Sequence, residues 1–155
     1  MIDKNLIVKG GSFQNYEEAI RFGGRLLYEN GYVDSGYTDS VLEREAQFPT
    51  GLPTQGVPMA IPHTGSEHVL KSMFCLVVFS DPVMFRQMGE TSEMIPAEIM
   101  VMLAIDGGEK HLKFLSNLIG LFSDGTVLTR IKDAKDSESI CRILKEFEQF
   151  NLDES

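Results

Sequence analysis

The chain has 155 residues, of which 43% are hydrophobic and 24% are charged, and this composition is typical of one compact globular domain. Lys and Arg total 14 against 23 Asp and Glu, and the net charge of -9 argues against a protein that binds the phosphate backbone of nucleic acids. The same charge is compatible with a protein partner that presents a basic face.

The sequence carries no visible signal for secretion or for membrane insertion. The sequence begins Met1-Ile2-Asp3-Lys4-Asn5, without a basic stretch followed by an apolar run. The apolar runs Met73–Phe79 and Ile99–Ile105 are far too short to span a bilayer. Cys75 lies in an apolar run and Cys141 in a helical pattern, so both are expected to be reduced, packed thiols of a cytoplasmic protein.

The first part of the chain is predicted to form a short strand and a well-capped helix. Leu6–Val8 has the composition of a strand. Asn15 and Glu18 fit a capping box, and Gly31 fits a helix C-terminal stop. We therefore expect a helix over Tyr16–Asn30.

The next part is predicted to form a helix, a loop and a short strand. The second helix covers Thr38–Gln47. Phe48–Gly56 holds two prolines and two glycines, which predicts a loop. Val57–Ile61 then has the composition of a strand, and Pro58 inside it indicates an edge strand or a bulge.

The remaining chain alternates apolar runs with helical patterns. Met73–Ser80 and Glu98–Ile105 are predicted to be strands buried on both faces. A helix is expected from Glu109 onward, and two more over Thr126–Lys132 and Ser137–Phe150. Because the links between the strands lack clear helices, we expect an α/β fold in which a mixed β-sheet is flanked by helices on both faces, in a single layered domain.

The segment Ala60-Ile61-Pro62-His63-Thr64 places a histidine directly after an apolar strand and a proline. Strand ends in α/β folds hold functional groups on a rigid support, and proline fixes the backbone dihedral. One imidazole nitrogen keeps a lone pair near neutral pH and can attack phosphorus, while a neighbouring carbonyl can hold the other N–H and fix the tautomer. The segment therefore favours His63 as a nucleophile; a solvated loop histidine is the alternative interpretation.

Phosphoryl transfer also needs donors for the charge on the phosphate oxygens. His111 falls in the first turn of the helix predicted from Glu109, where free backbone N–H groups favour anions. Arg44 lies at the end of the second predicted helix, and a guanidinium can grip phosphate through two parallel hydrogen bonds. Each also has a simpler interpretation, His111 as a helix-flank residue and Arg44 as the partner of acidic neighbours.

These residues together resemble the type 2 enzyme IIA domains, the mannitol–fructose superfamily of the sugar phosphotransferase system. That family has an apolar strand leading into Ile-Pro-His or Val-Pro-His, and Ala60-Ile61-Pro62-His63 matches it. It also has an arginine about twenty residues before the histidine, matched by Arg44, and in many members a second histidine in a later helix, matched by His111. The resemblance covers residues 5 to 150 and implies one enzyme IIA domain over residues 1–155.

Within the superfamily the chain is most similar to the galactitol-specific branch. The resemblance lies in the stretch Arg44–Leu52, and in Pro62-His63-Thr64 followed by His68-Val69. Mannitol and fructose members usually have glycine directly after the active histidine, where this chain has Thr64. We interpret His68 as a loop or packing residue.

The resemblance implies a phosphotransferase component with a phosphohistidine intermediate on His63, supported by His111 and Arg44. It implies a cytoplasmic protein that accepts phosphate from the phosphocarrier HPr and passes it to a cysteine of a separate enzyme IIB, which serves a membrane enzyme IIC for galactitol or a related polyol. No cofactor, metal, nucleic acid or membrane insertion is expected.

Three alternatives stay open. A nitrogen-type enzyme IIA would share the histidine but signal to protein partners through its phosphorylation state, and the Phe48–Leu52 stretch argues against it. A metal site built on His63, His68 and His111 would lack the usual helical ligand spacing. A fused carrier that uses a cysteine, as enzyme IIB does, would need a glycine-rich loop around that cysteine, and neither cysteine has one.

Overall fold

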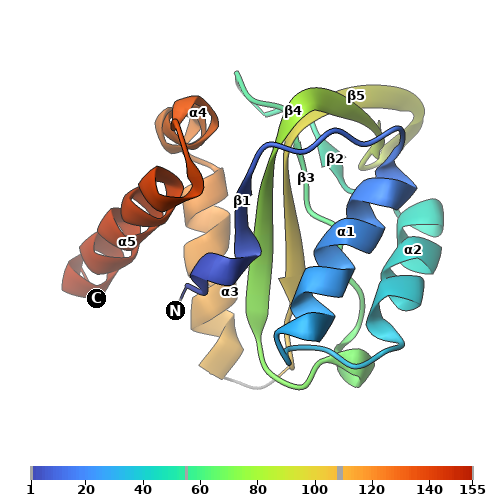
Figure 1. Cartoon of the computed structure of the whole chain (residues 1–155), viewed down its shortest axis with the longest axis horizontal. Helices are drawn as coiled ribbons and strands as arrows, with labels where there is room; N and C mark the ends of the chain where they lie inside the picture. The colour runs from blue at the N-terminus through green and yellow to red at the C-terminus, as the bar shows by residue number, and fades with distance from the viewer. Residues whose placement is uncertain (1, 55, 108–109, 155) are drawn as a thin grey trace.

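Figure 1 shows the chain as a computed structural model with a β-sheet between two groups of helices. The structure describes residues 2–54, 56–107 and 110–154, and the side chains of these residues except in 110–115 and 148–154. In the described part of the chain the sheet has five strands in the order β1-β4-β2-β3-β5, with β4 also paired to β5. The strands are β1 (Ile7–Lys9), β2 (Gly51–Leu52), β3 (Met59–Ala60), β4 (Met73–Gln87) and β5 (Glu90–Ala104).

The sheet is mixed, as predicted. Strands β4 and β5 form a long antiparallel hairpin in which Leu76 pairs with Val101. Strand β1 runs parallel to β4, and β3 runs parallel to β5. Strands β2 and β3 pair antiparallel, with Gly51 opposite Ala60. The absence of a helix between the predicted central strands was therefore a correct signal for a mixed sheet.

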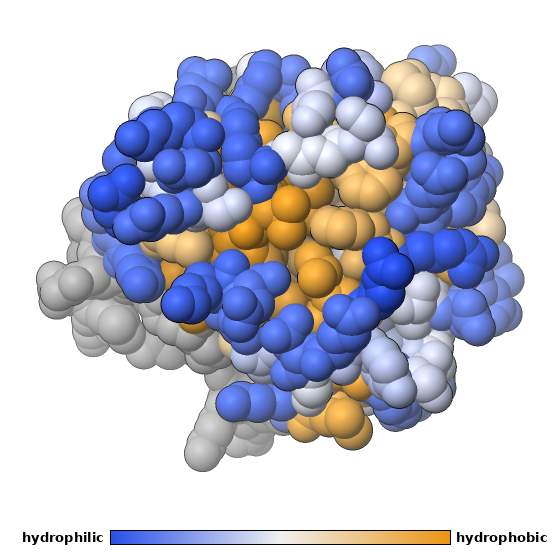
Figure 2. Space-filling view, in the orientation of Figure 1, coloured by the Kyte–Doolittle hydropathy of each residue, from blue (hydrophilic) through white to orange (hydrophobic). Residues whose placement is uncertain are grey.

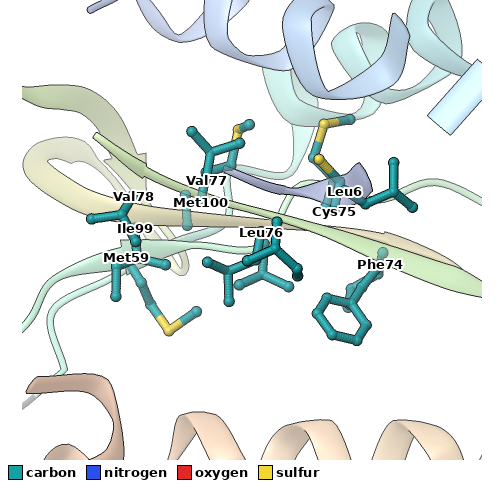
Figure 3. Close-up of a cluster of buried hydrophobic side chains, with 14 of the residues drawn as sticks. Leu6, Met59, Phe74, Cys75, Leu76, Val77, Val78, Ile99 and Met100 are labelled. Carbon is teal, nitrogen blue, oxygen red and sulfur yellow. The ribbon is translucent and has the colours of Figure 1, made fainter. Parts of the chain in front are cut away.

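Helices cover both faces of the sheet, which confirms the predicted layers. Figure 1 shows α1 and α2 on one side, and α3, α4 and α5 on the other. Figure 3 shows the matching alternation along β4: Cys75 and Val77 point to one side of the sheet, and Phe74 and Leu76 to the other. The helices are α1 (Tyr16–Glu29), α2 (Tyr37–Gln47), α3 (Lys110–Phe122), α4 (Gly125–Asp133) and α5 (Ser137–Glu154).

Helix α1 begins and ends where its sequence signals predict. The side chain of Asn15 accepts a hydrogen bond from the backbone N–H of Glu18 at 2.9 Å, and Glu18 in turn accepts from the N–H of Gln14 at 3.0 Å. Gly31 follows the helix with a φ of +86°, a conformation that glycine adopts without strain. The capped helix then packs closely on the sheet: a Cβ atom on Gly23 would lie 2.4 Å from the sulfur of Met102.

Two strand predictions were too short. We expected strands over Met73–Ser80 and Glu98–Ile105, whereas β4 and β5 continue to the turn that joins them. In the continuation Phe85 is buried while Met84 and Met94 are exposed, so one face of the hairpin packs and the other meets solvent. This alternation is typical of an antiparallel sheet that is covered on one side only.

Two predictions around the third strand were wrong. The predicted loop Phe48–Gly56 contains strand β2, and the strand predicted over Val57–Ile61 is limited to β3. Strand β3 is not an edge strand, because it pairs with β2 on one side and β5 on the other. Pro58 lies just before β3, where its carbonyl oxygen accepts a hydrogen bond from the N–H of Glu98 at 2.8 Å. A proline at that point removes no ladder donor.

The edge strand β1 lies in an apolar region of the surface. Figure 2 shows hydrophobic residues at the centre of this face, where Figure 1 places β1, with hydrophilic residues around them. The backbone N–H of Lys9 donates to the hydroxyl of Ser137, the first residue of α5, at 3.1 Å, so part of the strand edge is capped by a helix. No helix among the described residues combines the length and the apolar character that crossing a bilayer requires.

Candidate functional site

His63 lies at the end of a strand, as the sequence predicts. Strand β3 ends at Ala60, and after Pro62 the chain places His63 beside Leu103 of β5 in an isolated parallel bridge. The N–H of Leu103 donates to the carbonyl of Pro62 at 3.1 Å. The His63 side chain is half-buried, so its backbone is fixed by the sheet while the ring stays accessible.

The local backbone fixes which ring nitrogen of His63 is protonated. Nδ1 lies 2.8 Å from the carbonyl oxygen of Ile61, two residues earlier. A carbonyl oxygen only accepts hydrogen bonds, so the neutral ring carries its proton on Nδ1. Nε2 then keeps its lone pair, which is the electronic requirement for a nucleophilic imidazole.

Helix α2 holds two neighbours of His63: the residue paired with it on β5 and the residue that follows it in the chain. The Tyr37 hydroxyl donates to the carbonyl of Leu103 at 2.8 Å. The hydroxyls of Ser40 and Thr64 are 2.6 Å apart, so one donates to the other. Burial raises the pKa of Tyr37 far above its ordinary value, which keeps this phenol protonated and able to donate. One polar face of α2 thus fixes the position of the histidine segment.

Arg44 lies on the same side of α2 as Ser40. It follows Ser40 by four residues, so the two side chains are neighbours on the helix surface. It lies in the last turn of α2, as predicted, and its side chain is exposed. Its guanidinium carbon is 5.3 Å from the ring centre of Phe48, a cation–π contact. Arg44 therefore lies one helical turn along α2 from Ser40, the residue whose hydroxyl contacts Thr64.

His111 is the second residue of α3, in the first helical turn as predicted, and its side chain lies outside the described residues. The segment before α3 packs on the loop that follows His63. A Cβ atom on Gly107 would lie 3.4 Å from the hydroxyl oxygen of Ser66. The N–H of Asp106 also donates to the hydroxyl of Ser72 at 2.9 Å. Residues 106 and 107 thus contact the loop after the histidine.

His68 joins two loops. Its Nδ1 is 2.9 Å from Oδ1 of Asp34, and the N–H of Asp34 donates to the His68 carbonyl at 2.9 Å. The same carboxylate accepts from the N–H of Gly36, where a Cβ atom would lie 2.6 Å from the imidazole of His68. The contacts of His68 therefore anchor the loop after His63 to the loop between α1 and α2, which agrees with its interpretation as a loop or packing residue.

An apolar groove of about 440 Å³ lies beside the histidine segment, between the sheet and helices α3 and α4. Its lining includes Ile61 and Leu103, which contact His63 through the backbone, and Leu118, Ile119 and Phe122 of α3. Ile119 is 59% exposed. An accessible apolar surface next to this segment suits a protein partner that has to approach it.

Comparison with known proteins places this chain in a family. Residues 1–147 match the family described as phosphoenolpyruvate-dependent sugar phosphotransferase system, EIIA 2. The chain belongs to this family. Enzyme IIA components are phosphotransferases that act through a phosphohistidine, and this chain is such a component.

The relatives include proteins for two sugar alcohols. This enzyme IIA is 34% identical, over 84% of each chain, to the mannitol-specific phosphotransferase enzyme IIA component of Halalkalibacterium halodurans. It is 28% identical to the galactitol-specific EIIA component of Escherichia coli, over 75% of this chain and 77% of that one. It is also 30% identical to the mannitol-specific EIICBA component of E. coli, over 83% of this chain, and spans about a fifth of that longer protein.

A solved structure shares the fold. Enzyme IIAMTL of E. coli, determined in complex with phosphorylated enzyme IIBMTL, superposes with a TM-score of 0.77 at 25% identity. The superposition covers 94% of this chain and 98% of that one. An enzyme IIA of this family therefore pairs with an enzyme IIB.

The metal alternative includes His111, whose side chain lies outside the described residues, and the cysteine alternative depends on Cys75 and Cys141. Within residues whose side chains are described, no three His, Cys, Asp or Glu groups are close enough to hold a metal ion. Cys75 and Cys141 are free and buried, as predicted for packed thiols. Burial raises the pKa of the Cys75 thiol to about 12, so this sulfur is not a thiolate at neutral pH.

Sequence reasoning missed the polar residues of α2 that hold the site. Glu45 is 4% exposed, and its Oε1 accepts from the N–H of Thr50 at 3.1 Å and from the Thr50 hydroxyl at 2.6 Å. The signal was present: Tyr37, Val41 and Glu45 recur every four residues and form the buried stripe of α2. We grouped Glu45 with the charged neighbours of Arg44 instead of with that stripe.

We predict that Glu45→Gln becomes more stable relative to the wild-type protein as pH rises. Burial, the largest influence, raises the pKa of Glu45 above its ordinary 4.5, against opposing effects of the Thr50 hydrogen bonds and of Arg86. The folded protein therefore keeps a proton that the unfolded chain has already released, so the wild-type free energy of unfolding falls as pH rises through this interval. Glutamine keeps an accepting oxygen and does not ionise.

The measurement is urea unfolding of both proteins at a series of pH values from about 4 to 7. Val41→Ala is the matched control, because this buried neighbour on α2 does not titrate and its effect should be the same at every pH. The free energy of unfolding of Glu45→Gln is compared with that of the wild-type protein at each pH. If the advantage of Glu45→Gln stays constant or shrinks as pH rises, the raised pKa of Glu45 is contradicted.

Proposed function

We propose that this enzyme IIA carries a phosphoryl group on Nε2 of His63, taken from HPr and passed to a cysteine of a separate enzyme IIB. The observation that carries the proposal is the 2.8 Å contact between Nδ1 of His63 and the Ile61 carbonyl. It leaves Nε2 as the ring nitrogen with a free lone pair, on a half-buried side chain at a strand end.

In the proposed transfer, the Nε2 lone pair attacks the phosphorus while the bond from phosphorus to the donor breaks, and the donor keeps that electron pair. The ring retains its Nδ1 proton, so no proton has to move during the step. Positive charge that develops on the ring is stabilised by the Ile61 carbonyl dipole at 2.8 Å. In the second step a cysteine thiolate attacks the phosphorus, and the breaking P–N bond returns its electron pair to Nε2.

Arg44 and His111 are proposed to hold the oxygens of the transferring group. Arg44 is supported by its place on the face of α2 that contacts the His63 segment. His111 is supported by its position in the first turn of α3, where the backbone N–H groups and the helix dipole favour anions. Neither residue forms a covalent bond in this scheme. Their positive or donating groups offset the charge of the phosphoryl oxygens within a chain of net charge -9.

HPr and enzyme IIB are proposed to dock in turn on one surface, the apolar groove beside His63. A partner must bring its own reacting atom to Nε2, so both partners need the same approach. The groove is lined by Ile61 and Leu103 on the sheet side and offers the exposed Ile119 on the helix side. A small interface of this kind is typical of brief encounters. We place the exchange in the cytoplasm as one carrier domain over residues 1–155, with enzyme IIB serving a membrane enzyme IIC.

We predict that the protein labelled from phosphoenolpyruvate, enzyme I and HPr carries an acid-labile, base-stable phosphoryl group, and that His63→Ala carries none. A phosphoramidate has this stability pattern. His68→Ala is the matched histidine control and should be labelled like the wild-type protein, because its imidazole contacts Asp34 in the neighbouring loop. Undiminished labelling of His63→Ala would rule out the carrier assignment.

Arg44→Ala and His111→Ala should each keep the fold and slow phosphoryl transfer through His63. Removing one oriented donor from a charged transition state raises the barrier by about 2–4 kcal/mol, with oxyanion holes as the guide. Rapid-quench transfer from phosphorylated HPr measures the rate. Arg130→Ala is the control, since this exposed arginine pairs with Glu146 across α4 and α5. Wild-type rates in both test variants would show that these residues do not serve the site.

The transported substrate is proposed to be a sugar alcohol, with galactitol favoured by the Arg44–Leu52 and Pro62–Val69 stretches. The support is similarity to mannitol-specific and galactitol-specific relatives. We expect phosphorylated protein, mixed with membranes that contain its enzyme IIB and enzyme IIC, to phosphorylate galactitol in preference to mannitol and pentitols. Preference for another polyol would retain the carrier and discard galactitol. Transfer to no sugar, with a partner that binds one phosphorylation state only, would favour the nitrogen-type regulatory alternative.

A further inference from the structure

Glu45 is a buried carboxylate that the proposed transfer does not use. It is 4% exposed and lies on the buried stripe of α2 between the sheet and the helix, rather than at the surface beside Arg44. Burying a carboxylate is unfavourable unless hydrogen bonds satisfy it, and Thr50 provides them through both its N–H and its hydroxyl. A buried acid bonded to Thr50, whose carbonyl accepts from the N–H of Ile61 next to the His63 segment, therefore needs an explanation.

The contacts of Glu45 continue to the catalytic histidine without interruption. Glu45 accepts from the N–H of Thr50 at 3.1 Å and from its hydroxyl at 2.6 Å. The Thr50 carbonyl accepts from the N–H of Ile61 at 3.4 Å. The Ile61 carbonyl accepts from Nδ1–H of His63 at 2.8 Å. Four residues in two separate parts of the chain thus form one connected series of hydrogen bonds that ends on the imidazole.

The series matters because the peptide unit that carries the Ile61 carbonyl has no N–H of its own. That carbonyl belongs to the peptide bond between Ile61 and Pro62, and proline provides no N–H to hold that peptide unit. Its orientation is set by the neighbouring bonds: Ile61 N–H to the Thr50 carbonyl before it, and Leu103 N–H to the Pro62 carbonyl after it. If Thr50 shifts, the carbonyl that selects the His63 tautomer shifts with it.

We propose that Glu45 is a positioning residue for His63, which acts by fixing Thr50 and, through the Ile61 backbone, the carbonyl that keeps the imidazole proton on Nδ1. The inference rests on the proposed carrier function, and it adds a residue on a different face of α2 from Arg44. Glu45 touches neither the phosphoryl group nor the reacting nitrogen. Its effect is on the fraction of His63 that presents a free Nε2 lone pair.

The test compares variants that remove the acceptors with variants that keep them. Glu45→Met has similar volume and no accepting oxygen, and Thr50→Val keeps the shape of Thr50 but loses the hydroxyl. Glu45→Gln and Thr50→Ser keep the hydrogen bonds and are the conservative partners. Val41→Ala is the control for a general loss of stability, because Val41 is buried on the same helix and takes no part in the series.

Two readouts are measured on each full-length protein. The first is the tautomer of unphosphorylated His63, from imidazole nitrogen shifts in ¹⁵N-labelled protein at a pH where the ring is neutral. The second is the rate of phosphorylation by phosphorylated HPr, and its pH profile. In Glu45→Met and Thr50→Val we expect the Nε2–H tautomer to grow in and the rate to fall roughly three- to tenfold, as for one lost hydrogen bond. Glu45→Gln and Thr50→Ser should keep both readouts near the wild-type values.

The proposal is overturned if Glu45→Met and Thr50→Val show the same tautomer and rate as Val41→Ala, or if Glu45→Gln is as impaired as Glu45→Met. If Glu45→Met does not fold, the comparison of Thr50→Val with Thr50→Ser decides whether the series positions His63. Failure of the carrier function is distinct, because it would appear as wild-type protein that is not labelled on His63. The tautomer readout needs no phosphate and would still report whether Glu45 positions the ring.

Discussion

The burial of two strands on both faces determines the rest of this structure. Every residue from Met73 to Phe79 in β4 and from Ile99 to Ala104 in β5 is buried. Such strands are stable only under helices on both sides, because removing apolar surface from water is the main gain in free energy. Over these residues both faces of the sheet are therefore closed to solvent. Polar chemistry is left to the strand ends, and His63 lies at one of them, beside Leu103 near the end of β5.

A strand end under a helix creates a second constraint. Backbone N–H and C=O groups that leave the ladder while still buried need other partners. Helix α2 supplies them: the Tyr37 hydroxyl serves the carbonyl of Leu103, and the Glu45 carboxylate serves the N–H of Thr50. The polar side chains on the buried stripe of α2 thus satisfy groups that would otherwise destabilise the fold. The same bonds fix the backbone around His63, so stability and the precise placement of the histidine depend on the same contacts.

The sequence predicted the parts that follow from long apolar runs and from local signals at the ends of elements. The apolar runs of β4 and β5, the cap of α1 at Asn15 and the strand-end position of His63 were all visible. The extension of the hairpin was not, because Pro82 and Pro96 lie inside it and proline argues against a strand. The structure accommodates Pro82 where the pairing register shifts between Val78 and Val83.

Short elements set by distant contacts could not be predicted. Strand β2 has two residues, and it exists because Gly51 lets the backbone approach β4: a Cβ atom there would lie 2.6 Å from the carbonyl oxygen of Arg86. In the sequence that glycine reads only as part of a loop. Thr50, which precedes Gly51, is likewise placed by pairing with Ile61 and by Glu45. The role of Glu45 depends on which side of α2 faces the sheet. The packing of the other residues of the helix decides that orientation.

The choice of a carbonyl as the partner of Nδ1 also has an electrostatic reason in the proposed carrier. A carboxylate at that position would fix the same tautomer, but it would add a negative charge beside a phosphoryl group that is itself negative. The Ile61 carbonyl is neutral, and the nearest acid in the hydrogen-bonded series, Glu45, is two residues removed through Thr50. In a chain of net charge -9 this separation matters. In the proposed scheme the ring is oriented by a dipole, and the phosphoryl oxygens are left to the positive charge of Arg44.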